Sequence, residues 1–170
     1  MLVYRFDARY PEKQRIARDV LHRGLRDDSA RIPHQALIEF VSAVTRTRVG
    51  SDPLLSADEA RHEVEELMTQ FPILYPNAAI VRSALLGAAG YRFSWFDAHF
   101  WAYAEHYGLE EIVSEDFEHG RLYGSVRVSN PFGEGCGRSL FQQRKKGAIT
   151  RALDSAELGS AGRPRAAVPT

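Results

Sequence analysis

Hydrophobic and polar residues alternate along the first 132 residues in two distinct patterns. Apolar residues recur at helical spacing in five stretches, which predict helices at residues 11–26, 34–46, 56–70, 78–90 and 94–108. Short apolar or β-branched runs lie among them and predict strands at residues 2–4, 31–33, 72–75, 111–114 and 126–128. Strands that alternate with helices are typical of sheets covered on both faces. The sequence therefore predicts a three-layer α/β/α domain over residues 1–132, with a mostly parallel central sheet.

The helix predicted to start at Ser94 is apolar around most of its circumference, yet its first turn carries the carboxylate of Asp97. On a helical wheel the neighbours of Asp97 are Phe100, Trp101 and Ala104. A buried carboxylate must be hydrogen-bonded, paired or bound to a metal, because an isolated buried charge is too costly. Ser94 and Asp97 also fit a capping box, and this stretch alone favours the cap over a functional acid.

Acidic side chains in two further segments are candidates for a functional site. Glu39 lies at the margin of the apolar face of its helix, and periodicity alone favours an ordinary half-exposed side chain there. Glu115 and Asp116 directly follow a predicted strand, at the sheet edge where open α/β folds place their sites, although a solvated turn fits equally well. Carboxylates that converge there with Asp97 repel one another unless a cation is present. Such hard oxygen ligands select Mg²⁺ or Mn²⁺, which can activate water for phosphodiester cleavage.

Composition narrows the class of protein. Of the 170 residues, 44% are hydrophobic and 26% are charged, as in soluble globular proteins. The single cysteine, Cys136, excludes an internal disulfide and favours the cytoplasm, and no apolar run is long enough to span a membrane. The net charge of zero combines basic ends with an acidic middle, which does not favour a general nucleic-acid-binding surface. His99 and His106 are expected to be residues at the edge of the core rather than zinc ligands.

Five motifs follow one another in an order and spacing that resemble the PIN-domain family, and VapC-like toxins of bacterial toxin–antitoxin pairs in particular. They are Leu-Val-Tyr-Arg-Phe-Asp at 2–7, Gln-Ala-Leu-Ile-Glu-Phe at 35–40, Ser-Trp-Phe-Asp-Ala at 94–98, Ser-Glu-Asp-Phe-Glu-His-Gly at 114–120 and Asn-Pro-Phe at 130–132. The resemblance implies a Mg²⁺- or Mn²⁺-dependent endoribonuclease that cleaves single-stranded RNA. It implies a homodimer, and a small antitoxin protein that covers the site.

The same resemblance assigns roles to particular residues. It implies that Glu39, Asp97 and Asp116 are the catalytic residues and the metal ligands. Ser114 is expected to be a supporting polar group near the metal, and Glu115 is expected to point elsewhere.

The family pattern also includes an opening strand with an Asp-x-Asn motif, which has no counterpart before Leu2. Asp7 follows the first apolar run and is expected to be a loop residue rather than a replacement. Either the true start lies upstream of Met1, or the product is a catalytically impaired PIN fold that only binds an antitoxin or dimerises. The local consistency of the sequence from Met1 to Phe132 favours an upstream start. A metal-dependent nuclease that acts on DNA is a third hypothesis.

From residue 133 the composition shifts to glycine, serine, alanine, arginine and proline. Residues 133–170 are expected to form a flexible, basic C-terminal tail, weakly helical at most over 139–158. On this interpretation the chain after Phe132 can be deleted with little effect on stability or activity.

Overall fold

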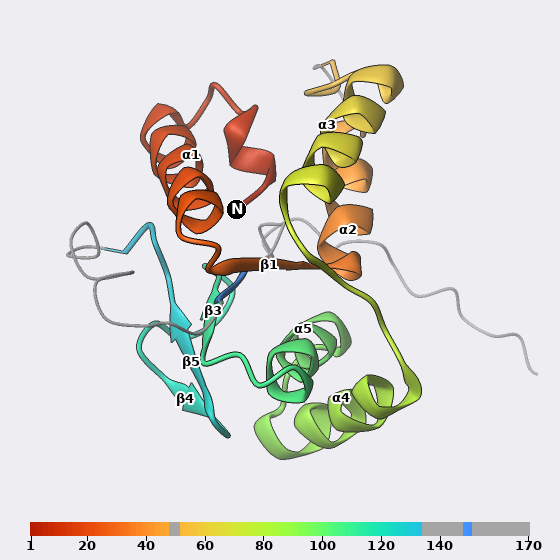
Figure 1. Ribbon diagram of the computed structural model, residues 1–170, viewed down its shortest axis with the longest axis vertical. Helices are drawn as coiled ribbons and strands as arrows, with labels where there is room; N and C mark the ends of the chain where they lie inside the picture. Colours follow the sequence, from red (N-terminus) through yellow and green to blue (C-terminus); the bar gives the residue numbers. More distant parts are fainter. Residues whose placement is uncertain (48–51, 134–147, 151–170) are drawn as a thin grey trace, which may run out of the picture.

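A computed structural model describes residues 1–47, 52–133 and 148–150, the last three by their backbone (Figure 1). The helices are the 3₁₀ helix η1 (Val3–Arg5), α1 (Pro11–Arg26), α2 (His34–Val44), α3 (Ala57–Gln70), α4 (Ala78–Tyr91) and α5 (Trp95–His106). The strands are β1 (Ala30–Pro33), β2 (Ile73–Leu74), β3 (Glu111–Val113), β4 (Leu122–Tyr123), β5 (Val126–Ser129) and β6 (Ala148–Thr150). The five predicted α-helices are all present, with ends shifted by at most two residues.

The strands form one sheet in the order β2-β1-β6-β3-β5-β4. All neighbouring strands are parallel except β4 and β5, which form an antiparallel hairpin. β6 lies between β1 and β3, with Ile149 in register with Arg31 on one side and with Ile112 on the other. The mostly parallel sheet predicted from the sequence is confirmed.

Helices cover both faces of this sheet, as successive residues of β3 show. Val113 packs in a cluster with Tyr4, Ala17 and Val20, on the side of η1 and α1. Its neighbour Ile112 belongs to the larger core on the other face, which includes much of α5. In Figure 1, α1 lies on one side of β1, and α4 and α5 lie on the other. The three-layer α/β/α fold is therefore confirmed.

Local sequence signals account for the starts of α3 and α4. Ser56 and Glu59 form the expected capping box, in which the Glu59 amide donates to the Ser56 hydroxyl and the Ser56 amide donates to the Glu59 carboxylate. The side-chain oxygen of Asn77 accepts from the amides of Ala79 and Ile80 at the start of α4.

No helix in the described ranges has the length and apolar character needed to cross a bilayer.

The strand predicted at residues 2–4 is wrong, because these residues lie in η1 and its start. The amide of Phe6 donates to the carbonyl of Val3 at 3.0 Å, and Leu2 has helical backbone angles of −58° and −40°. A run of three residues has too little periodicity to distinguish a strand from a turn. Here the chain turns at once so that Tyr4 packs against α1.

The interpretation of residues 133–170 as a weakly helical tail differs from the structure at residues 148–150. These residues form β6, in the middle of the sheet. Strand formation there depends on the two edges that β1 and β3 offer, and such tertiary pairing outweighs local propensity. Residues 134–147 and 151–170 lie outside the described residues, so the proposed boundary after Phe132 stays a prediction for them.

Candidate active site

Two of the predicted acidic residues, Glu39 and Asp116, follow parallel strands that point the same way. β1 and β3 both run parallel to β6, so their carboxyl ends lie at the same edge of the sheet. β1 continues directly into α2, which carries Glu39, and β3 continues into Ser114 and Asp116. Parallel α/β folds place their sites at this edge.

Glu39 is more deeply buried than its position on the helical wheel suggests. Glu39 belongs to α2, and only 6% of the residue is exposed, whereas periodicity favours a half-exposed glutamate. This margin of α2 is linked to α5, because the side-chain amide of Gln35, one turn before Glu39, donates to the carbonyl of Phe96 at 3.1 Å. The same amide donates to Glu39 Oε1 at 2.6 Å.

Asp97 lies in the first turn of α5, and both interpretations of its sequence context fit the geometry. Ser94 is the N-cap, and its Oγ accepts from the Asp97 amide at 3.2 Å. The Ser94 hydroxyl also donates to Asp97 Oδ2 at 2.6 Å. The cap that begins the helix therefore also orients the half-buried carboxylate.

Ser114 and Asp116 form a similar local pair at the end of β3. The buried Ser114 Oγ accepts from the Asp116 amide at 3.1 Å and lies 3.4 Å from Asp116 Oδ2. Glu115 points toward α1 instead, where its carboxylate forms a 2.6 Å ion pair with Lys13.

Contacts between neighbouring residues link the three acidic segments. Gln35 ties the Glu39 turn of α2 to the first turn of α5. The rings of Phe93, just before the Ser94 cap, and Phe117, just after Asp116, pack edge to face with centroids 5.3 Å apart. Segments that are far apart in sequence thus meet at one edge of the sheet.

The donor chemistry of these residues fits a hard divalent cation, since Glu39, Asp97 and Asp116 all offer carboxylate oxygens. Within residues 1–47 and 52–133, however, no three histidine, cysteine, aspartate or glutamate side chains are already arranged to hold a metal ion. The three carboxylates are supported separately, each by a neutral hydrogen-bond donor: Gln35, Ser94 or Ser114.

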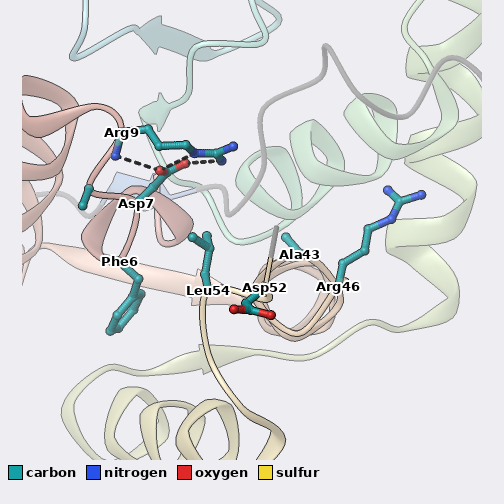
Figure 2. A pocket seen from close by; sticks show the side chains of 8 residues that line it. Phe6, Asp7, Arg9, Ala43, Arg46, Asp52 and Leu54 are labelled. Carbon is teal, nitrogen blue, oxygen red and sulfur yellow. Dashed lines mark hydrogen bonds and ion pairs between the residues drawn. The ribbon is translucent and has the colours of Figure 1, made fainter. Parts of the chain in front are cut away.

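Asp7 lies in the loop after η1, as the sequence predicts. Its buried carboxylate is held by Arg9, whose Nε lies 2.8 Å from Oδ1 and whose Nη2 lies 2.7 Å from Oδ2. Figure 2 shows this guanidinium along both carboxylate oxygens, at a pocket of about 200 Å³ that Phe6 and Leu54 also line. The bidentate pair gives Asp7 a structural partner of opposite charge.

Sequence reasoning gave no role in the site to two polar residues of this region, Gln35 and His99. The Nδ1 atom of His99 in α5 lies 2.9 Å from the side-chain oxygen of Gln35, and burial lowers the pKa of this histidine. The i,i+4 spacing of Gln35 and Glu39 was the available signal, because it places both residues on one face of a helix. His99 gave no comparable signal.

The sequence matches the model of a known protein family. A family model described as PIN domain matches residues 2–124, a range that includes Glu39, Asp97, Ser114 and Asp116. No curated protein matches the sequence. PIN domains in general are metal-dependent nucleases, and the matched range includes the three acidic segments that meet at the carboxyl edge of the parallel sheet. The chain belongs to the PIN-domain family.

Proposed function

We propose that this protein is a toxin-type endoribonuclease that hydrolyses phosphodiester bonds in single-stranded RNA with Mg²⁺ or Mn²⁺. The observation that carries the proposal is the meeting of the three acidic segments at one edge of the sheet. Glu39, Asp97 and Asp116 are the proposed metal ligands and catalytic residues, with Ser114 in support.

The local hydrogen bonds suit such a role. The Ser94 and Ser114 hydroxyls and the Gln35 amide orient their carboxylates without adding positive charge. Carboxylate oxygens oriented in this way are the ligands that Mg²⁺ and Mn²⁺ prefer. When bound, the cation supplies an activated water and neutralises charge on the phosphate. The residues of the chain would hold the ligand oxygens in place and present them to the cation.

Two exposed aromatic residues next to Asp97 support a single-stranded substrate. Trp95 and Phe96 begin α5 and are 45% and 51% exposed. Unpaired bases stack on such rings, whereas bases in a duplex are covered by their neighbours. The choice of RNA over DNA rests on the resemblance to VapC-like toxins, and with it a cytoplasmic location.

The test is cleavage of a single-stranded RNA and of the DNA with the same sequence, in Mg²⁺, in Mn²⁺ and with EDTA. RNA cleavage that needs the metal is expected, and D97N, E39Q and D116N should each lower it by more than about 100-fold, the upper range for groups that act indirectly on a metal site. D58N is the matched control, because Asp58 also lies in a first helical turn but its side chain is 97% exposed. Cleavage of DNA alone would favour the third hypothesis, and full activity of D97N would refute the site.

A second candidate function is a non-catalytic PIN-fold module that binds an antitoxin or dimerises. It is favoured by the lack of a preassembled metal-binding group among the described residues. It predicts tight binding of a small protein partner without RNA cleavage and without any effect of Mg²⁺ on thermal stability.

Apolar surfaces are compatible with the proposed protein partners under either function. A groove of about 520 Å³ between α2 and α3, lined by Leu37, Ile38, Val41, Val64, Met68 and Tyr75, suits an apolar segment of an antitoxin. On α4, Val81, Leu85 and Leu86 are exposed and supply apolar area for a homodimer.

A further inference from the structure

We propose that Gln35 is a positioning residue, which sets the Glu39 carboxylate in place and ties it to the turn of α5 that carries Asp97. The inference rests on the proposed function, because it concerns the same metal site. It adds to that site two residues outside the acidic set, Gln35 itself and His99, which holds it.

The hydrogen bonds of Gln35 define the orientation of its amide. The residue is 9% exposed, and its Nε2 donates to Glu39 Oε1 at 2.6 Å and to the Phe96 carbonyl at 3.1 Å. Both partners are acceptors, so a flipped amide would direct its oxygen at two other oxygens. The two donor hydrogens of Gln35 are therefore both engaged, one on α2 and one on α5.

His99 completes the bridge from the α5 side. Its Nδ1 lies 2.9 Å from Gln35 Oε1, and because an amide oxygen only accepts, Nδ1 carries the proton. The imidazole is itself fixed between aromatic rings, with centroids 5.8 Å from Trp95 and 5.3 Å from Tyr103. A continuous chain of hydrogen bonds thus runs from His99 through Gln35 to Glu39.

These hydrogen bonds restrict the flexible side chain of Glu39 before a cation binds. A glutamate side chain has three rotatable bonds, and freezing them on binding costs conformational entropy. The bond from Gln35 to Oε1 selects one orientation, and the bond to Phe96 sets that orientation relative to the Asp97 turn. Outer residues that orient metal ligands in this way typically change metal affinity by about 10–100-fold when they are removed.

The experiment measures Mn²⁺ affinity and metal-free stability for wild type, Q35M and Q14M. Methionine keeps the length of glutamine but donates no hydrogen bond. Gln14 is the control, because it is a half-buried helical glutamine that donates to the carbonyl of Arg5 at 3.0 Å rather than to one of the three acids. Q35M is expected to raise the Kd for Mn²⁺ by about ten-fold or more, and Q14M to leave it unchanged. A purely structural role would lower the melting temperature of Q35M without a change in Kd.

A second measurement needs neither metal nor a folded Q35M variant. NMR should find the side-chain amide protons of Gln35 protected from solvent exchange in metal-free wild type, and less protected in H99L, which loses the donor to Gln35 Oε1. Rapid exchange of these protons in wild type would overturn the bridge.

Failure of the positioning role of Gln35 and failure of the proposed function give different results. An equal Kd in wild type and Q35M overturns the positioning role but leaves the proposed function standing. If wild type binds no Mn²⁺ and cleaves no RNA, the proposed function fails, and this inference fails with it.

Discussion

Tyr103 is fully buried in α5, and its hydroxyl has no hydrogen-bond partner among the described residues. Burial raises the pKa of Tyr103 to about 12, with a smaller contribution from Tyr107. A buried hydroxyl without a partner costs free energy that a phenylalanine would not. The chain therefore has a residue in its core that should weaken the fold at high pH.

The pH dependence follows from the two pKa values. In the unfolded chain a tyrosine loses its proton near its ordinary pKa of about 10, while folded Tyr103 keeps its proton to about pH 12. Between these values the unfolded state binds fewer protons, so the free energy of unfolding should fall as the pH rises above about 10. Urea unfolding of wild type and Y103F between about pH 7 and about pH 11 measures this, and Y103F should show a smaller alkaline loss.

At neutral pH, Y103F should be as stable as wild type or more stable, by up to about 1 kcal/mol. A loss of more than about 1 kcal/mol would mean that the hydroxyl has a partner and would contradict this account.

Residue-level sequence reasoning located the Ser94 cap and the acid beside it, but it did not foresee the burial of Glu39. The cap is a local pattern, so four consecutive residues carry it. The environment of Glu39 depends on α5, which lies about sixty positions along the chain. The roles of Gln35 and His99 could not be predicted for the same reason, because each depends on a hydrogen bond to the other across 64 positions of the chain.

At the scale of elements, the α4–α5 hairpin depends on one close approach. A Cβ atom on Gly87 of α4 would lie 2.6 Å from Cε3 of Trp101 in α5, whereas one on Gly90 of the same helix would meet nothing within 4 Å. G87A should lower the free energy of unfolding by about 1–3 kcal/mol through overpacking.

G90A is the matched control for this helix pair. It should raise stability by up to about 1 kcal/mol, because alanine favours helix over glycine. Thermal or urea unfolding measures both changes. Equal effects of the two substitutions would contradict the proposed packing.

Among the changes to these elements, removal of β6 is expected to lower the free energy of unfolding the most. β6 is the strand that joins β1 to β3, so its removal would leave the facing edges of two buried strands without hydrogen-bond partners. Deletion of residues 134–170 should therefore cost more than about 3 kcal/mol or prevent folding, the scale of broken buried networks. This reverses the sequence-based expectation that the chain after Phe132 is dispensable.

The control is a chain that ends at Thr150, which keeps β6 and should remain close to full length in stability. Urea unfolding of the three chains provides the measurement. Equal stability of all three would show that β6 does not hold the sheet together.

Helices were easier to predict than strands for a physical reason. Ser56, Asn77 and Ser94 mark helix starts with their own side chains, and apolar periodicity extends over three or more turns. Strands of two to four residues contain at most two periods of their pattern. β6 lies in a glycine- and arginine-rich context, and only its pairing with β1 and β3 makes it a strand.

Across the whole molecule, the parallel sheet brings acidic segments that are distant in sequence to one edge. The order of strands in the sheet differs from their order in the chain. β1 and β3 therefore lie on either side of β6, although α2 to α5 separate them in the chain. The PIN fold could therefore be predicted from the order of elements and motifs. The way in which Gln35, Ser94 and Ser114 support separate carboxylates could not, because it arises from packing.

Mn²⁺ binding tests most directly whether Glu39, Asp97 and Asp116 form one metal site. It is measured as the rise in the free energy of unfolding of wild type, E39Q, D97N, D116N and the control D58N. Wild type and D58N should gain about 2.7 kcal/mol when Mn²⁺ is present at about 100 times its Kd, and EDTA should abolish the gain. Each of the three other variants should gain clearly less at the same concentration, because each removes one ligand of a shared site. A full gain in any of the three, or none in wild type, would show that these residues do not form a shared metal site.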